Sequence, residues 1–275
     1  MWTKMTFAAL FMAAGCAVMA GSGPYFDSYT HHMEVGEWEL EIGADAVQTI
    51  EGSWEYGQQI EMEHGFNEHW AGSLYVVGGR TGDNQWELDG YKVEARFRPW
   101  TRNFFFIPTF YLEYEQFHHE ELYRDSVEGN AEHEEASRTT EHEAEARLIF
   151  SQDFDWGNVV LNIVGERSLD GGRTAIGYTA GFFIKGPSSG IAGAADFDPD
   201  QDGDSHVLFG AEAFGGLGQE GDLGPQSHLQ EDYIQPFLAL PLSKRVVLKS
   251  AVAVGLTRPS ENRFRLIFVV RLGKV

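Results

Sequence analysis

Alternation between apolar and charged side chains is the feature that most constrains this chain. It is clearest in the last stretch, 262–275, which reads NRFRLIFVVRLGKV. Every second residue from Phe264 to Leu272 is apolar, whereas Arg263, Arg265 and Arg271 have the opposite parity. A period of two predicts a β-strand with one apolar face and one basic face. A strand of a soluble sandwich gives the same pattern, so the stretch alone does not decide the fold.

The same alternation recurs along the chain and predicts about twelve antiparallel strands, within a range of 10–14. Short connections at 66–69, 99–102, 152–156 and 241–245 alternate with longer ones at 79–90, 118–139 and 216–227. This asymmetry is typical of outer-membrane barrels, which have short periplasmic turns and longer extracellular loops. The stretch 186–205 does not fit this asymmetry, because it is long but falls on the periplasmic side. It is either a long periplasmic turn or contains a further pair of strands. The expected strands are 37–46, 58–65, 70–77, 91–98, 103–117, 140–150, 158–166, 174–185, 206–215, 228–239, 246–255 and 262–275.

Charge at the two ends of the pattern favours a closed sheet. The polar parity of the first strand is acidic, with Glu37, Glu39, Glu41 and Asp45, and that of the last strand is basic. Opposite charges on facing positions stabilise strand pairing, and these two strands are neighbours only if the sheet closes. We therefore expect an all-β, antiparallel transmembrane β-barrel rather than a soluble all-β domain.

The N-terminus has the features of an export signal. Lys4 precedes a short apolar run, and Val18-Met19-Ala20 offers a small-residue cleavage site, so residues 1–20 are predicted to be a signal peptide cleaved near Ala20. Cys16, the single cysteine, lies in a weak match to a lipoprotein box, which leaves lipidation as an alternative. Residues 21–36 lack periodicity and are expected to be a periplasmic lead-in, followed by one barrel domain over 37–275. The predicted location is the bacterial outer membrane.

Composition excludes several classes of protein. The formal net charge is −22, which disfavours a nucleic-acid partner because phosphates require basic patches. Aromatic residues make up 13% of the chain, which argues against disorder. The expected partners are outer-membrane lipid, the barrel-assembly machinery and small solutes.

Several short segments resemble a large group of bacterial outer-membrane barrels. They are MEHGFNEHWAGSLY at 62–75, FGAEA at 209–213, QPFL at 235–238, and GLTRPS at 255–260 followed by RFRL at 263–266. The chain is similar to porin-like barrels assigned to phenol-degradation pathways, the MetA-pathway-like group. The resemblance implies an outer-membrane location and passive or selective uptake, and it transfers no catalytic residue. The chain ends in Leu-Gly-Lys-Val instead of the aromatic residue with which such barrels usually end.

Charged residues on the polar parity are predicted to face the lumen. Two functions follow from them: a porin-like channel or transporter for small solutes, or a structural or divalent-metal-binding barrel plugged by salt bridges. The predicted lumen-facing residues are Glu37, Glu39, Glu41, Lys92, Glu94, Arg96, Glu113, Glu115, Glu143, Glu145, Arg147, Arg263, Arg265 and Arg271.

Two loops carry candidate metal ligands, although no cofactor is otherwise expected. Aspartates recur at every second position around Gly203, as in a calcium loop; they are Asp198, Asp200, Asp202 and Asp204. The twelfth loop position, where a calcium loop has an acidic residue, is occupied by Phe209. Either a Ca²⁺ site or a solvated acidic loop fits this pattern. The loop 118–139 mixes histidines with glutamates, for which a solvated extracellular loop is the better interpretation.

An enzyme is not expected. The adjacent pairs Ser205-His206 and Ser227-His228 point to opposite faces of a strand, and no nucleophile-elbow signature occurs in the sequence.

Overall fold

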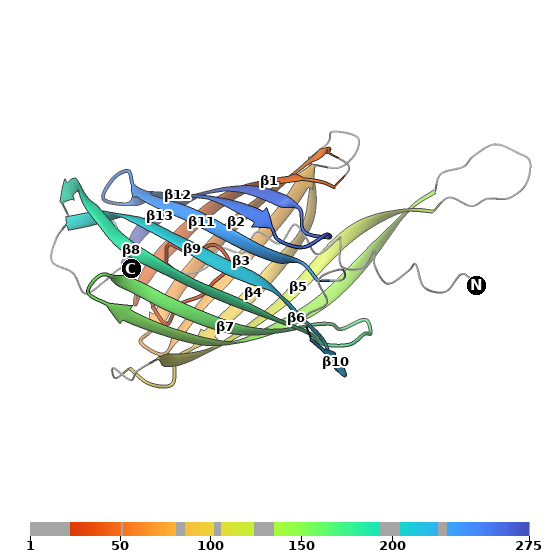
Figure 1. The fold of residues 1–275 in the computed structure, drawn as a ribbon, viewed down its shortest axis with the longest axis horizontal. Coiled ribbons are helices and arrows are strands. Elements are labelled where there is room, and N and C mark those ends of the chain that lie inside the picture. The colour runs from red at the N-terminus through yellow and green to blue at the C-terminus, as the bar shows by residue number, and fades with distance from the viewer. Residues whose placement is uncertain are drawn as a thin grey trace, which may run out of the picture.

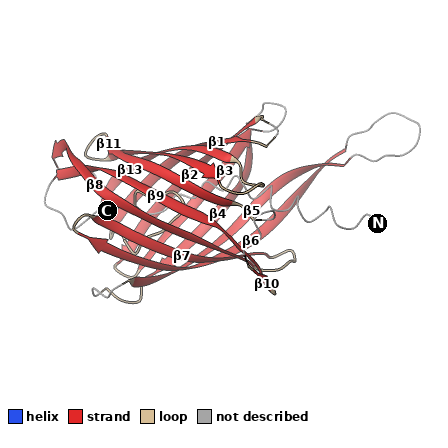
Figure 2. Cartoon of the chain, viewed as in Figure 1, coloured by secondary structure: helices blue, strands red, loops and turns tan. Residues whose placement is uncertain are grey.

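The computed structural model describes residues 23–50, 52–80, 86–101, 106–123, 135–192, 204–224 and 230–274. These residues form twelve long strands and one two-residue strand, β10 (Figures 1 and 2). They contain no helix long and apolar enough to cross a membrane. The strands are β1 Glu37–Gln48, β2 Trp54–Asn67, β3 Trp70–Arg80, β4 Trp86–Phe97, β5 Ile107–Tyr123, β6 Glu135–Phe154, β7 Gly157–Ser168, β8 Ala175–Ala192, β9 Asp204–Gln219, β10 Asp222–Leu223, β11 Asp232–Pro241, β12 Val246–Gly255 and β13 Asn262–Lys274.

The long strands form one closed antiparallel barrel. Each pairs with the next along the chain, β9 pairs with both β8 and β11, and β13 returns to pair with β1. The predicted fold class is therefore confirmed, with twelve strands in the wall. The register between the first and last strands places Asp45 opposite Arg265 and Glu39 opposite Arg271, as the charge pattern requires.

Two connections differ from the predicted ones. The interval 118–139 was expected to be a loop, but β5 and β6 pair as far as Tyr123 and Glu135 and extend well beyond the rim (Figure 1). The interval 186–205 is likewise shortened, because β8 reaches Ala192 and β9 starts at Asp204. In both intervals the alternation of apolar and polar residues weakens, because these ends of the strands no longer have one apolar face. Periodicity alone therefore underestimated the length of the strands.

The barrel is polar inside and apolar outside. Ile42, Leu74 and Leu112 are 45%, 54% and 63% exposed on the outer face, whereas Lys92 and Arg96 on the opposite parity are at most 1% exposed. This inverts the pattern of a soluble protein and matches the lipid-facing wall of a membrane barrel. Period-two alternation is the direct cause, since successive side chains of a strand point to opposite faces.

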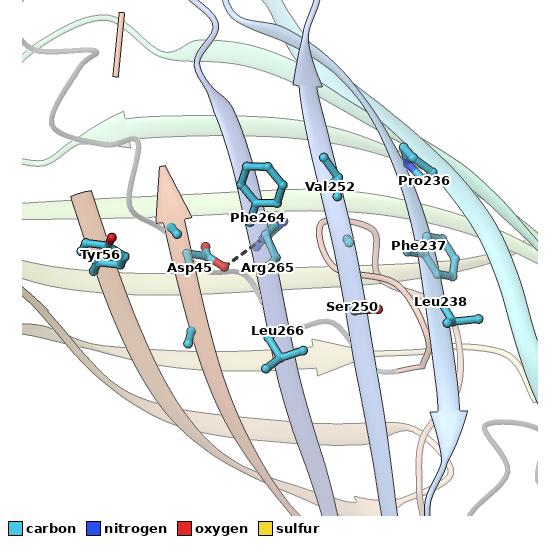
Figure 3. Close-up of a pocket in the computed structure, with 13 residues that line it drawn as sticks. Asp45, Tyr56, Pro236, Phe237, Leu238, Ser250, Val252, Phe264, Arg265 and Leu266 are labelled. Carbon is cyan, nitrogen blue, oxygen red and sulfur yellow. Dashed lines mark hydrogen bonds and ion pairs between the residues drawn. The ribbon is translucent and has the colours of Figure 1, made fainter. Parts of the chain in front are cut away.

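A shallow depression crosses the outer wall where β2, β1, β13, β12 and β11 lie side by side (Figure 3). Small side chains such as Ala44 and Ser250 line it together with Tyr56 and Phe264. The ion pair of Asp45 and Arg265 also belongs to its lining and is drawn with its dashed contact in Figure 3.

Candidate functional site in the barrel lumen

The charged side chains of the polar parity are concentrated inside the barrel. Ten carboxylate residues and five Lys or Arg residues of the described part of the chain are buried. Of the residues predicted to face the lumen, the buried ones are Glu39, Glu41, Lys92, Glu94, Arg96, Glu113, Glu115, Glu145, Arg147 and Arg265, and the partly buried ones are Glu37, Glu143, Arg263 and Arg271. The other buried charged residues are Asp45, Glu61, Glu63, Glu212 and Lys249.

The strand registers align the carboxylates into one continuous arc. Reading across neighbouring strands from β1 to β7, successive partners are Glu39, Glu63, Ser73, Glu94, Glu113, Glu145 and Glu166. Six of these seven positions are glutamates. Carboxylates at facing positions repel one another unless a cation or a proton lies between them. The arc therefore favours positive charge along one side of the lumen.

Three cationic side chains from neighbouring positions neutralise part of this acidic arc. Lys92 contacts Glu115 and lies 3.8 Å from Glu113. Arg96 contacts Glu63, and its Nε lies 2.9 Å from an Oε1 of Glu94. Both cations lie two residues from Glu94 along β4, so Lys92 faces Glu115 and reaches Glu113 diagonally, while Arg96 contacts Glu94 along the same strand.

Arg147 completes this set from β6. Its Nη2 donates to Oε2 of Glu145 at 3.1 Å. The same guanidinium stacks on the ring of Tyr29 at 4.9 Å and donates from Nη1 to the carbonyl of Asp27 at 2.7 Å. Arg147 thus joins the acidic arc to a segment that lies inside the barrel.

The seam between β1 and β13 is held by the predicted opposite charges. Nε of Arg265 lies 3.4 Å from Oδ1 of Asp45, and Nε of Arg271 lies 3.6 Å from Oε2 of Glu39. Arg263 differs from the others, because it faces Val47 across the seam and bonds to Glu231 at 3.0 Å. Two of the three arginines of the closing strand therefore bridge to the first strand.

The segment Gly23–Gly36 lies within the barrel, which corrects the expectation of a periplasmic lead-in. Tyr25, Phe26 and Tyr29 are completely buried. The segment leaves the lumen beside the end of β2, where Val35 forms a parallel bridge with Gly65. A Cβ atom at Gly65 would lie 2.3 Å from the carbonyl oxygen of Glu34, so glycine permits this close passage. We call residues 23–36 the lumen segment.

Glu212 on β9 holds the turn of the lumen segment through its backbone. Its carboxylate accepts the backbone N–H groups of Phe26 at 3.0 Å, Asp27 at 3.0 Å and Ser28 at 2.8 Å. It also accepts Nε2 of Gln235 at 2.9 Å. Successive N–H groups that converge on one carboxylate make a strong, charge-assisted anchor.

Two further barrel residues, Asn162 and Lys249, also bind backbone groups of the segment. Asn162 acts like a strand partner for Tyr29, because its Oδ1 accepts the backbone N–H at 2.8 Å and its Nδ2 donates to the carbonyl at 3.0 Å. Lys249 donates to the carbonyls of Gly23 and Tyr25, each at 3.3 Å, and lies 3.2 Å from Glu41. These contacts satisfy backbone groups that would otherwise be buried without partners.

Side chains of the lumen segment contact both walls. The carboxylate of Asp27 contacts Nη1 of Arg265 at 2.5 Å and Nε2 of Gln235 at 2.8 Å. On the acidic side, the hydroxyl of Tyr29 donates to Glu94 at 3.1 Å. The segment therefore bridges the basic and acidic sides of the lumen.

A histidine–carboxylate group lies where the lumen segment nears the β6–β7 turn. Nε2 of His31 is 3.2 Å from Oδ2 of Asp153, and Nε2 of His32 is 3.2 Å from Oδ1 of the same carboxylate. The three candidate ligand atoms lie within 4.8 Å of one another. Burial lowers the pKa of His31, which favours its neutral imidazole.

The metal ligands predicted from the sequence lie elsewhere. Asp198, Asp200 and Asp202 are outside the described residues, and Asp204 is the first residue of β9. The calcium loop therefore stays a prediction. In the β5–β6 hairpin, Nδ1 of His118 contacts the hydroxyl of Thr140 at 3.0 Å, and Nδ1 of His142 contacts that of Tyr114 at 2.7 Å.

The lumen segment was not predicted from the sequence, and neither were Asn162 and Glu212 among the residues that bind it. Asn162 and Glu212 occupy inward positions of predicted strands, but their partners lie more than 130 residues away. Irregular backbone has no periodicity that could reveal such partners. The available signal was composition: Tyr25, Phe26 and Tyr29 are bulky for an exposed lead-in.

Comparisons with known proteins support the fold. No family model matches the chain, and no curated protein matches it. Among solved structures, the chain is similar to the KdgM porin, with a TM-score of 0.51 and 10% identity over 84% of this chain and 98% of that one. It is also similar to the translocator domain of the autotransporter NalP from Neisseria meningitidis, with a TM-score of 0.51 and 10% identity over 98% of each chain. At this identity the likeness establishes an outer-membrane β-barrel fold.

Proposed function

We propose that this protein is a porin-like outer-membrane channel whose lumen is closed by its own segment Gly23–Gly36. The observation that carries the proposal is the combination of a charge-lined barrel interior with a buried, non-strand segment inside it. A barrel of twelve strands is wider than the small barrels that side chains alone fill. The lumen segment occupies that additional space, and its displacement would open a path.

The charge of the lumen supports transport of cationic or neutral small solutes. Ten buried carboxylate residues face five buried Lys and Arg residues, and the acidic arc runs across β1 to β7. Rings of acidic side chains favour cations in a pore, because the carboxylates compensate for part of the hydration that the cation loses there. The KdgM porin, solved in one structure with disordered oligogalacturonate, is a fold neighbour with a TM-score of 0.50 and 9% identity. The acidic arc gives no support for a similar anionic substrate here.

The proposed cellular location and protein group rest mainly on the sequence. The predicted signal peptide and the barrel fold support an outer-membrane location, and the short motifs at 62–75 and 255–266 support membership of the MetA-pathway-like barrels. The alternative is a structural barrel that the lumen segment closes permanently, and the dense anchoring by Glu212 and Asn162 favours that reading.

Planar-bilayer recordings separate the two functions. We expect the purified protein to show brief openings, and the reversal potential in a KCl gradient to indicate preference for K⁺ over Cl⁻. Glu94→Gln should reduce this preference, because Glu94 lies in the acidic arc, whereas Glu220→Gln in the exposed turn after β9 should not. Anion preference would overturn the proposed solute class. Absence of openings, even after the lumen segment is loosened, would favour the structural barrel.

A further inference from the structure

Two adjacent histidines of the lumen segment point at one carboxylate of the barrel wall. His31 and His32 are neighbours in sequence, yet their rings lie together, with centroids 4.3 Å apart and planes 31° apart. In an extended strand, adjacent side chains would point to opposite faces. The irregular backbone of the segment therefore allows both rings to reach Asp153, the penultimate residue of β6.

Two of the three separations between these atoms are close to those of metal ligands. Ligand bonds of about 2.1 Å at tetrahedral angles place ligand atoms roughly 3.4 Å apart. Nε2 of His31 is 3.2 Å from Oδ2 of Asp153, Nε2 of His32 is 3.2 Å from Oδ1, and the three candidate ligand atoms lie within 4.8 Å of one another. Small side-chain rotations would therefore bring two nitrogens and one oxygen around a single ion, with water in the remaining position.

The surroundings hold the carboxylate while leaving it accessible. Nδ2 of Asn158 donates to Oδ1 of Asp153 at 2.6 Å, and Oδ1 of Asn158 accepts the hydroxyl of Tyr25 at 2.9 Å. Such outer contacts orient ligands in metal sites. The side chain of Asp153 is 43% exposed while that of His31 is 6% exposed, so an ion could enter from one side of a largely built site.

We propose that His31, His32 and Asp153 bind a first-row divalent transition metal ion of the zinc class, which pins the lumen segment to the end of β6. Imidazole nitrogen with one carboxylate suits Zn²⁺, Co²⁺, Ni²⁺ or Cu²⁺. Ca²⁺ and Mg²⁺ do not fit, because they take oxygen ligands. This site is distinct from the predicted calcium loop and does not depend on whether the barrel conducts.

Titration with Co²⁺ tests the site directly in the purified barrel, after treatment with a chelator. We expect a saturable visible absorption band of tetrahedral Co²⁺ with one ion per chain, which Zn²⁺ then removes by competition. His31→Gln, His32→Gln and Asp153→Asn should each weaken binding by at least roughly 10- to 100-fold, by analogy with losses at metal sites.

His118→Gln is the matched control, because His118 lies on the β5–β6 hairpin and contacts Thr140. It should bind Co²⁺ like the wild-type protein. Heat-modifiable gel migration establishes that each variant is folded before titration. Lack of saturable binding by the wild-type protein, or equal binding by folded Asp153→Asn and wild-type proteins, would overturn the proposal. Loss of binding in His118→Gln would also contradict it.

Discussion

Replacing Glu212 by glutamine should loosen the lumen segment without altering the shape of the side chain. The carboxylate accepts four hydrogen bonds, from the backbone N–H groups of Phe26, Asp27 and Ser28 and from Nε2 of Gln235. Oε1 accepts from Asp27 and Ser28, so an amide that places its NH₂ group at the Oε1 position loses two bonds to the segment. At about 1.5 kcal/mol for each lost charge-assisted bond, the segment is destabilised by about 3 kcal/mol. The ratio of displaced to bound segment therefore rises roughly 100-fold.

Cysteine labelling measures this displacement. Ser28 is completely buried and its hydroxyl has no hydrogen-bond partner among the described residues, so Ser28→Cys is a mild replacement. The single natural cysteine, Cys16, lies in the predicted signal peptide. When the segment closes faster than it is labelled, the rate of reaction with a water-soluble maleimide follows the displaced fraction.

We expect Glu212→Gln to increase the labelling rate of Ser28→Cys roughly 100-fold, as worked from the lost hydrogen bonds. Glu220→Gln, the same chemical change on an exposed residue of the turn after β9, should leave the rate unchanged. Equal labelling in the Glu212→Gln and Glu220→Gln backgrounds would refute the role of this carboxylate. Fast labelling in the wild-type background would show that the segment is not held in the lumen.

Two further predictions concern the wall. Arg265→Glu should destabilise the barrel by about 3–5 kcal/mol, because it leaves the buried carboxylate of Asp45 and the partly buried carboxylate of Asp27 without their cation. Urea unfolding followed by gel migration should show this loss. An equal effect of Arg258→Glu at an exposed loop position would contradict the prediction. Gly157→Ala should impair folding at the β6–β7 turn, because φ is +155° there and a Cβ atom would lie 1.9 Å from the carbonyl oxygen of Phe183. Gly171→Ala, at a positive-φ position with open space around it, is the control, and normal folding yield of Gly157→Ala would refute the steric argument.

The barrel was predictable because its cause is local. Alternation places Ile42 and Leu74 outside and Lys92 and Arg96 inside, and it does so strand by strand without knowledge of distant partners. Opposite charges on the first and last strands then predicted the seam, and the observed pairing of Asp45 with Arg265 follows that prediction.

The contents of the lumen were not predictable in the same way. The lumen segment is irregular, and Asn162 and Glu212 recognise its backbone, which carries no sequence signal. His31 and His32 likewise become a group with Asp153 only because the segment returns to the end of β6. Long-range contacts of an aperiodic segment depend on the closed barrel around it, so they appear only with the three-dimensional structure.

Single-channel recording of the wild-type protein beside Glu212→Gln tests the central claim most directly, because it asks whether displacement of residues 23–36 opens a path. We expect the open fraction to rise by about the same factor as the Ser28→Cys labelling rate. A large increase in labelling with no increase in open fraction would show that the segment moves without opening a path, and would contradict a channel closed by its own N-terminal segment.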